Sequence, residues 1–223
     1  MSAELIALRQ HIIDACHQLE RSGLNRGTSG NVSCRHGDHF LITPSGVPVS
    51  QLRPERIVAM DFTGKIMGDG QPSSEWHFHL DLLNNRPELN AIVHTHSPHA
   101  TALACLREDL PAFHYMIAIA GGDSVRCSPY ALFGTEALSA HAVNAMKDRK
   151  ACLLANHGLI AAGRDLDEAM SVATEIESLC QQYLIARQTG QPVLLSSEEM
   201  QAVINRFRSY GRNAHQTPQS PYQ

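Results

Sequence analysis

Apolar residues recur at steps of three and four over the first twenty residues, a pattern that predicts an amphipathic helix ending near Gly23. The apolar stripe consists of Leu5, Leu8, Ile12, Cys16 and Leu19. The same periodicity predicts helices over residues 98–108 and 135–149. Two capping signals, each an Asp or Ser with a Glu three residues later, begin a long helix at Asp165 and a last helix at Ser196.

Short apolar runs separated by Pro, Gly and Ser predict strands joined by turns. The runs FLITP, RIVAMD and GKIMG form a predicted meander, and AIVHTH (residues 91–96) is a predicted buried strand. Residues 124–127 predict a short strand, and ACLLANHG with LIAAG predicts a strand pair broken at His157. A helix that begins at the Ser-Ser pair 73–74 stops before Pro87, because the residue ahead of a proline resists the helical conformation.

Helices and strands intermingle over the whole length without a repeat or a linker. The sequence therefore predicts one domain of the α/β or α+β class over residues 1–211. Residues 212–223 have no apolar pattern, and we expect them to form a mobile tail. With 223 residues, 43% of them hydrophobic and 18% charged, the chain can bury a sizeable core and is not a disordered or coiled-coil sequence.

Net charge and cysteine usage indicate which partners and which cellular compartment to expect. The net charge is −4, so no basic surface is available for a phosphate backbone, and nucleic acid is excluded as a partner. Charged residues interrupt the N-terminal apolar positions, which argues against a signal peptide or a membrane span. The six cysteines lie at least 18 residues apart and form no CxxC pair, as in a reduced, cytoplasmic protein.

Histidine is over-represented, with 13 residues against three lysines. Residues two apart on a strand point to the same face, so His94 and His96 are spaced to hold one ion. His157 follows another apolar strand and is the third candidate ligand. Three histidines with an open fourth position are typical of a catalytic zinc site, whereas the alternative is three separately hydrogen-bonded core histidines. We interpret His77 and His79 as surface or packing residues.

Small residues gather in three short segments that can bind an anion through backbone N–H groups. These segments contain Gly30 and Asn31, Ser45 and Gly46, and Ser73 and Ser74. The last pair stands at a predicted helix N-terminus, where a phosphate would fit, although most such starts are only caps. Glu75, in the first turn of that helix, is a candidate general acid/base beside the metal.

Seven segments, taken together and in order, resemble the class II aldolase and adducin-head family, with the fuculose-phosphate aldolases as the nearest branch. The segments are GLNRGTSGNVS, LITPSGVP, PSSEWHFH, VHTHSPH, HYMIAIAGG, PYALFGT and ANHGLIAAG, and the resemblance runs over about residues 5–211. The resemblance implies a central, largely antiparallel sheet flanked by helices. It also implies a homotetramer with active sites between neighbouring subunits. The sequence departs from the fuculose branch at Asn156, where that branch has a histidine.

Carried over by this resemblance, site roles fall on matching positions. His94, His96 and His157 would bind one Zn²⁺ per subunit, and Glu75 would be the catalytic acid/base that also approaches the metal. The six residues of the small-residue segments would hold the substrate phosphate. Tyr115 of a neighbouring subunit would handle the proton of the aldehyde oxygen, and Tyr210 would close over the site; both tyrosine roles rest on the resemblance alone.

The implied reaction is reversible cleavage of a ketose 1-phosphate to dihydroxyacetone phosphate and a small aldehyde. Candidate substrates are L-fuculose 1-phosphate, 5-deoxyribulose 1-phosphate and 5-methylthioribulose 1-phosphate. An epimerase, a dehydratase or a decarboxylase acting on a sugar phosphate would use the same zinc site and is the alternative. A non-catalytic, adducin-like interaction module is a further alternative, but all three candidate ligands are retained.

Overall fold

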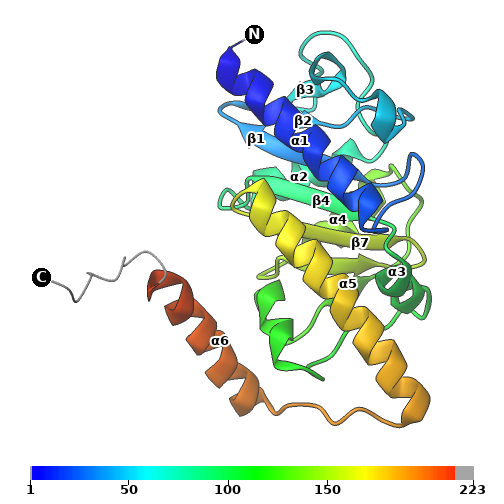
Figure 1. Ribbon diagram of the computed structural model, residues 1–223, viewed down its shortest axis with the longest axis vertical. Coiled ribbons are helices and arrows are strands. Elements are labelled where there is room, and N and C mark those ends of the chain that lie inside the picture. The colour runs from blue at the N-terminus through cyan, green and yellow to red at the C-terminus, as the bar shows by residue number, and fades with distance from the viewer. Residues whose placement is uncertain (1, 214–223) are drawn as a thin grey trace, which may run out of the picture.

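The computed structural model describes residues 2–213, with side chains through residue 207, and is built around a seven-stranded sheet (Figure 1). The spatial order of the strands is β3-β2-β1-β4-β7-β6-β5. Every neighbouring pair is antiparallel except β5 with β6, which is parallel. The strands are β1 (Asn31–His36), β2 (His39–Ile42), β3 (Val58–Asp61), β4 (Ala91–Thr95), β5 (Arg126–Ser128), β6 (Ala151–Leu154) and β7 (Gly158–Gly163). The expected largely antiparallel sheet is confirmed.

Helices precede, separate and follow these strands. The α-helices are α1 (Ala3–Arg21), α2 (Trp76–Asn85), α3 (Pro98–Cys105), α4 (Glu136–Ala145), α5 (Leu166–Thr189) and α6 (Ser197–Asn213). Three short 3₁₀ helices are η1 (Val49–Gln51), η2 (Pro54–Arg56) and η3 (Tyr115–Ala120). No helix among residues 2–213 is long and apolar enough to cross a membrane. Residues 214–223, most of the predicted tail, lie outside the described part of the chain.

The helices cover both faces of the sheet, because alternate residues of each strand point to opposite sides. On β4, Val93 packs into a core that includes α1, α3 and α5, whereas Ile92 packs into a second core with α2 and α4. In Figure 1, α1 and α5 run across the near face and α2 and α4 lie behind the sheet. His94 alternates with Val93 and therefore faces the α2 side.

Most predicted elements form, with differences at their ends. The two capping signals act as expected: the Asp165 side chain accepts the N–H of Glu168, and Ser196 and Glu199 cap each other. The predicted meander differs, because the run GKIMG forms only an isolated bridge between Ile66 and Met60. Its third strand is β1 (NVSCRH), which the sequence analysis missed although Val32 and Cys34 alternate with polar residues.

Candidate active site

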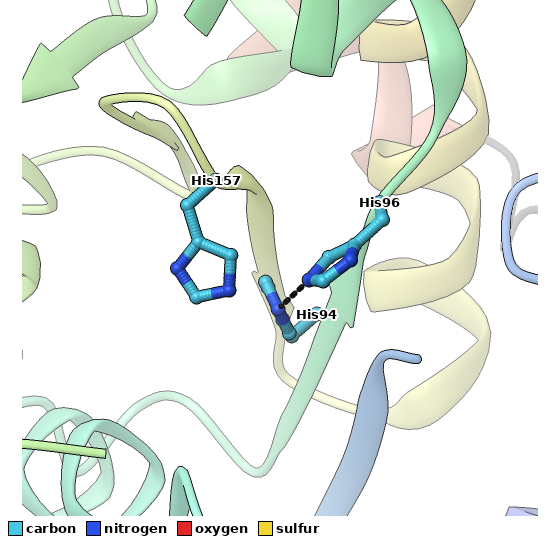
Figure 2. Close-up of side chains that lie close together, drawn as sticks. All are labelled: His94, His96 and His157. Atoms are coloured by element: carbon cyan, nitrogen blue, oxygen red, sulfur yellow. Dashed lines mark hydrogen bonds between the residues drawn. The ribbon is translucent and has the colours of Figure 1, made fainter. Parts of the chain in front are cut away.

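Three histidine rings meet where β4 and the β6–β7 turn lie side by side (Figure 2). His94 is on β4, His96 directly follows that strand, and His157 is in the turn. One ligand nitrogen of each ring lies within 4.8 Å of the others, and the ring centroids are 4.8–4.9 Å apart. The Nε2 atoms of His94 and His96 are 3.1 Å apart. The structure therefore brings together the three histidines that the sequence singled out, and we name them the histidine cluster.

Backbone contacts orient this cluster. The Nδ1 of His94 is 3.0 Å from the carbonyl oxygen of Leu159, so Nδ1 carries the hydrogen and Nε2 keeps its lone pair for the cluster. The N–H of His96 donates to the Oδ1 of Asn25 at 3.0 Å. Burial, followed by the proximity of His94 and His157, lowers the pKa of His96 to about 4, which keeps that imidazole neutral at physiological pH.

The turn that carries His157 depends on the glycine after it. A Cβ atom on Gly158 would lie 2.3 Å from the carbonyl oxygen of Thr95. Only a residue without a side chain therefore allows β7 to begin so close to the end of β4, and this close approach brings His157 to the β4 histidines.

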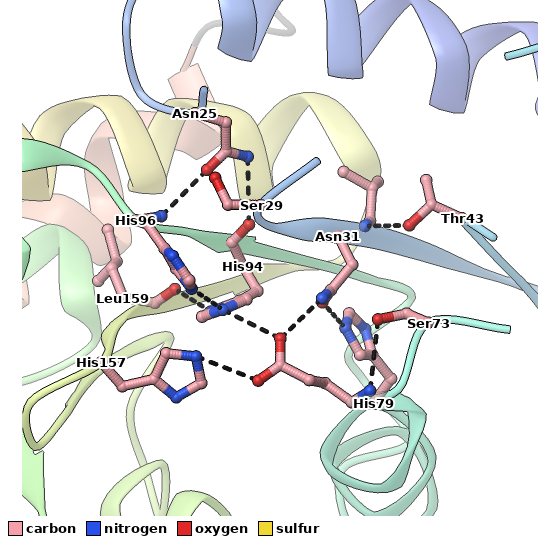
Figure 3. Close-up of polar contacts among 12 residues, drawn as sticks. Asn25, Ser29, Asn31, Thr43, Ser73, His79, His94, His96, His157 and Leu159 are labelled. Carbon is pink, nitrogen blue, oxygen red and sulfur yellow. Dashed lines mark hydrogen bonds and ion pairs between the residues drawn. The ribbon is translucent and has the colours of Figure 1, made fainter. Parts of the chain in front are cut away.

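Glu75 lies directly before α2 and contacts two rings of the cluster. Figure 3 marks these contacts by dashed lines from His94 and His157. The Oε1 of Glu75 is 3.1 Å from the Nε2 of His157 and its Oε2 is 3.3 Å from the Nε2 of His94, while the Nδ2 of Asn31 donates to Oε2 at 2.9 Å. Burial by itself would raise the pKa of Glu75, but His94 and His157 outweigh it and hold that pKa below its ordinary value. The side chain is therefore a buried carboxylate, with 7% of the residue exposed.

The position of Glu75 in the chain differs from the expectation. The helix begins at Trp76, not at the Ser-Ser pair, and Glu75 is its N-cap residue without a side-chain capping bond. Residues Ser73 and Ser74 precede the helix, and the hydroxyl of Ser73 accepts the N–H of Glu75. The carboxylate therefore does not cap the helix, and it contacts the histidine cluster instead.

The chemistry of these groups fits a divalent cation. Among the described residues, the buried Oε1 of Glu75 has no hydrogen-bond partner, because its contact with His157 is close but not aligned as a hydrogen bond. Three imidazoles with a carboxylate beside them form a donor set that suits zinc. A cation among them would satisfy both the lone pairs of the rings and this carboxylate oxygen.

A cavity of about 330 Å³ opens beside Glu75, His96 and His157. Its lining includes all six residues of the predicted anion-binding segments: Gly30, Asn31, Ser45, Gly46, Ser73 and Ser74. We call residues 28–31, 44–46 and 73–74 the small-residue loops. Aromatic and other side chains complete the lining: Tyr130, Ala131, Phe133 and Asn156. Anion-binding groups, an acid/base candidate and metal-ligand candidates therefore share one cavity.

Backbone pairing holds two of these loops together. Pro44 and Pro72 form an isolated antiparallel bridge, the N–H of Ser45 donates to Gln71, and the N–H of Ser73 donates to Thr43, both at 3.0 Å. The segment leaving β2 is thus fixed against the segment that enters α2. This pairing explains why residues nearly 30 positions apart line the same cavity.

Two buried residues of the site escaped the sequence analysis. The Nδ2 of Asn25 donates to the carbonyl oxygen of His94 at 3.5 Å, so its amide bonds to the backbone of both His94 and His96. His79 is fully buried, so of the two expected roles, surface or packing, the surface role is excluded, and its ring also bonds to Ser33 and Asn31. Its position four residues after Glu75, on the same helix face, was the available signal.

The two tyrosines are not brought into this cavity. Tyr115 begins η3, is 52% exposed and does not line the cavity of its own chain. Tyr210 lies on α6, and its side chain falls outside the described residues. Both assignments therefore stay predictions.

Comparisons with known proteins show which family the chain belongs to. A profile described as Class II Aldolase and Adducin N-terminal domain matches residues 10–184. The chain is 51% identical to the 5-methylthioribulose-1-phosphate/5-deoxyribulose-1-phosphate aldolase of Rhodospirillum rubrum, covering 99% of this chain and all of that one. It is 48% identical to the L-fuculose phosphate aldolase of Escherichia coli K12, covering 92% of this chain and 95% of that one.

A solved structure of an L-fuculose 1-phosphate aldolase superposes with a TM-score of 0.89 and 40% identity, covering 93% of this chain and 98% of that chain. Sequence and fold therefore agree over nearly the whole length. The chain belongs to the class II aldolase and adducin N-terminal domain family.

Proposed function

We propose that this chain is a zinc-dependent aldolase that reversibly cleaves a ketose 1-phosphate to dihydroxyacetone phosphate and a small aldehyde. The observation that carries the proposal is the placement of one buried carboxylate, Glu75, between the histidine cluster and the small-residue loops of a single cavity. His94, His96 and His157 would hold the zinc ion. When bound there, zinc supplies Lewis-acid stabilisation of the negative charge that develops on substrate oxygens.

The small-residue loops would bind the phosphate group. They offer backbone N–H groups and hydroxyls but no lysine, and such an arrangement binds anions by converging dipoles. Binding at the phosphate end orients the bond that breaks, and orientation of this kind lowers a barrier by several kcal/mol in favourable cases.

Glu75 would move the proton at carbon. When the C3–C4 bond breaks, the C4 hydroxyl loses its proton, the aldehyde leaves, and C3 must gain a proton to give dihydroxyacetone phosphate. Glu75, which is ionised in the resting site, would take up the proton released from the C4 hydroxyl, deliver it to C3, and remove it again in the reverse direction. Tyr115 would take part in the proton transfer at the C4 oxygen.

Tyr115 can serve in this way only from another subunit, because it does not line the cavity of its own chain. Its exposed position on η3 leaves it available to a neighbouring subunit, as in the homotetramer that the family resemblance implies. Mixing Tyr115→Phe subunits with Glu75→Gln subunits tests this proposal. We expect the hybrids to regain part of the activity that each parent lacks, since some sites then combine two intact residues. Hybrids no more active than their parents would contradict a shared site.

A reducing compartment suits this chain. All six cysteines are free thiols, and four of them are buried. This observation supports cytoplasmic localisation, in agreement with the sequence.

The aldehyde end favours a small apolar group. Tyr130, Ala131 and Phe133 give part of the cavity an apolar lining, which suits a methyl or methylthio group. The 51% identical relative is named for 5-methylthioribulose and 5-deoxyribulose 1-phosphates. We therefore favour these two substrates over L-fuculose 1-phosphate, whose aldehyde product carries a hydroxyl.

A panel of the three ketose 1-phosphates tests the proposal. Dihydroxyacetone phosphate is measured by coupling it to a reductase that oxidises NADH, and metal content is measured on the same preparation. We expect formation of dihydroxyacetone phosphate with zinc near one per chain, and a higher kcat/KM for the two ribulose derivatives. A product that keeps all carbons would replace this proposal with an epimerase or a dehydratase, and one that has lost only carbon dioxide would replace it with a decarboxylase.

A further inference from the structure

Three consecutive hydrogen bonds link Ser33, His79 and Asn31 to the carboxylate of Glu75. Figure 3 shows the contacts that Asn31 makes within this series. The Oγ of Ser33 is 2.7 Å from the Nδ1 of His79, and the Nε2 of His79 is 2.5 Å from the Oδ1 of Asn31. The Nδ2 of Asn31 then donates to the Oε2 of Glu75 at 2.9 Å. Every residue of this series is buried.

The regular elements make this arrangement rigid. Asn31 and Ser33 are two apart on β1 and therefore face the same side of the sheet, toward α2. His79 lies one helical turn after Glu75, and its ring sits with one nitrogen on each of the two β1 side chains. Asn31 also pairs with His94 across the β1–β4 ladder. The amide of Asn31 is thus fixed between α2 and the metal-ligand strand.

Donor and acceptor roles follow from the carboxylate. An ionised carboxylate only accepts hydrogen bonds, so the amide nitrogen of Asn31 must face Glu75 and the amide oxygen must face His79. The Nε2 of His79 then carries a hydrogen, and Nδ1 accepts the hydroxyl hydrogen of Ser33. Each group has one role, and reversal of the Asn31 amide would place two oxygens against each other.

His79 itself is not suited to proton transfer. Burial, followed by the proximity of His94, lowers its pKa to about 3, so the ring stays neutral. It has no contact with the cavity, whose lining does not include it.

We propose that His79, supported by Ser33, is a positioning residue that fixes the Asn31 amide and thereby the orientation of the Glu75 carboxylate. This inference rests on the proposed function, since it assigns Glu75 the proton transfer at carbon. In the absence of the Nε2–H donor, the Asn31 amide is free to turn, and Glu75 loses the group that holds its Oε2.

Two polar substitutions at position 79 separate positioning from simple packing. In His79→Gln the side-chain amide nitrogen reaches the place of Nε2, whereas in His79→Asn it reaches only the place of Nδ1. We expect His79→Asn to lower kcat roughly 10- to 100-fold with little change in KM. We expect His79→Gln to stay within about threefold of the wild-type kcat, because the donor to Asn31 remains.

The matched control is His77→Phe. His77 is on the same helix, stacks on Trp76 with ring centroids 3.8 Å apart, and takes no part in the hydrogen-bond chain. We expect its kcat and KM to equal the wild-type values, with unchanged zinc content in all three variants. Equal kcat in His79→Asn and His79→Gln overturns the inference, as does a higher KM with normal kcat.

Crystal structures of the two His79 variants give a readout that does not depend on activity. We expect the Asn31 amide to be turned away from Glu75 in His79→Asn and to keep its place in His79→Gln. An unchanged Asn31 amide in His79→Asn overturns the inference even where kcat falls. If the wild type releases no dihydroxyacetone phosphate from any ketose phosphate, the proposed function fails, while the crystallographic result still tests the positioning by His79.

Discussion

The two sides of the cavity are built in different ways. The histidine cluster consists of side chains placed by β4 and the β6–β7 turn, with rings fixed by bonds such as that from His94 to Leu159. The small-residue loops offer mainly backbone groups, and both of their glycines, Gly30 and Gly46, have positive φ angles, of +76° and +67°. One side therefore depends on the identity of a few side chains, and the other on conformations that side chains would disturb.

The largest effect is expected where a side chain of the cluster is removed. In His96→Ala the zinc site loses one of three protein ligands, so we expect zinc occupancy and cleavage activity to fall to background. Zinc bound only to the folded state stabilises it by about 4 kcal/mol when free zinc is about 1,000 times Kd. A chelator should therefore lower the Tm of the wild type and leave that of His96→Ala unchanged.

The control for this substitution is His11→Ala. His11 is exposed, and within the described part of the chain its side chain bonds to Asp167 alone, a surface contact that contributes little. We expect normal zinc content and activity in this variant. Full zinc content in His96→Ala would show that His96 is not a zinc ligand. It would also contradict the claim that the histidine cluster depends on the identity of its side chains.

The second-largest effect is expected at Glu75, which lies between the histidine cluster and the small-residue loops. Glu75→Gln keeps the volume and an oxygen for the Asn31 amide but cannot transfer a proton. We expect zinc to stay bound and kcat to fall roughly 10²-fold, within the range for loss of a general acid/base. Metal analysis and steady-state kinetics measure both quantities. Glu20→Gln, an exposed carboxyl on α1, is the control, and near-normal turnover in Glu75→Gln would exclude Glu75 from the mechanism.

The same contrast explains what sequence reasoning could reach. An HxH pair on an apolar strand carries its geometry in its spacing, so His94 and His96 were predictable, and the strand pair around His157 indicated a third ligand. The small-residue loops were visible as composition, but their meeting depends on the Pro44–Pro72 bridge, which no local pattern encodes.

The hydrogen bonds through His79 were even harder to predict from the sequence. Asn31 and Ser33 are polar residues of a central strand, and a strand whose polar positions are buried does not follow the usual alternation. Their burial is compensated by one histidine from α2, 46 residues later than Ser33. The sequence pattern of one chain also does not show which residues join the site of another subunit, as we propose for Tyr115.

Gly30 shows where the two sides depend on each other. A Cβ on this residue would lie 2.2 Å from the Nδ2 of Asn25, whose Oδ1 holds the N–H of His96. Gly30→Ala should cost about 1–2 kcal/mol from the left-handed backbone alone, and more because Asn25 must move. Urea unfolding measures this loss. We also expect a higher KM for the ketose phosphate.

Gly27→Ala is the matched control for the clash. Gly27 is in the same loop with φ +66°, and a Cβ there meets no heavy atom within 4 Å. It therefore undergoes the backbone strain without the contact, and the difference between the two variants isolates the effect of Asn25. If the two unfold at the same urea concentration, Asn25 does not couple the loop to the histidine cluster.

The smallest effect is expected from a single hydroxyl of the small-residue loops. Ser45→Ala leaves the backbone N–H of residue 45, which bonds to Gln71, and removes only one hydroxyl from the cavity lining. A hydrogen bond to a charged group contributes about 1.5 kcal/mol, so KM for the ketose phosphate should rise about tenfold with kcat and zinc content unchanged. Competition by inorganic phosphate should weaken in parallel. Ser50→Ala, at an exposed position of η1 outside the cavity, should change neither value. A normal KM in Ser45→Ala would mean that the phosphate is held by backbone groups alone, which would make the contrast between the two sides complete.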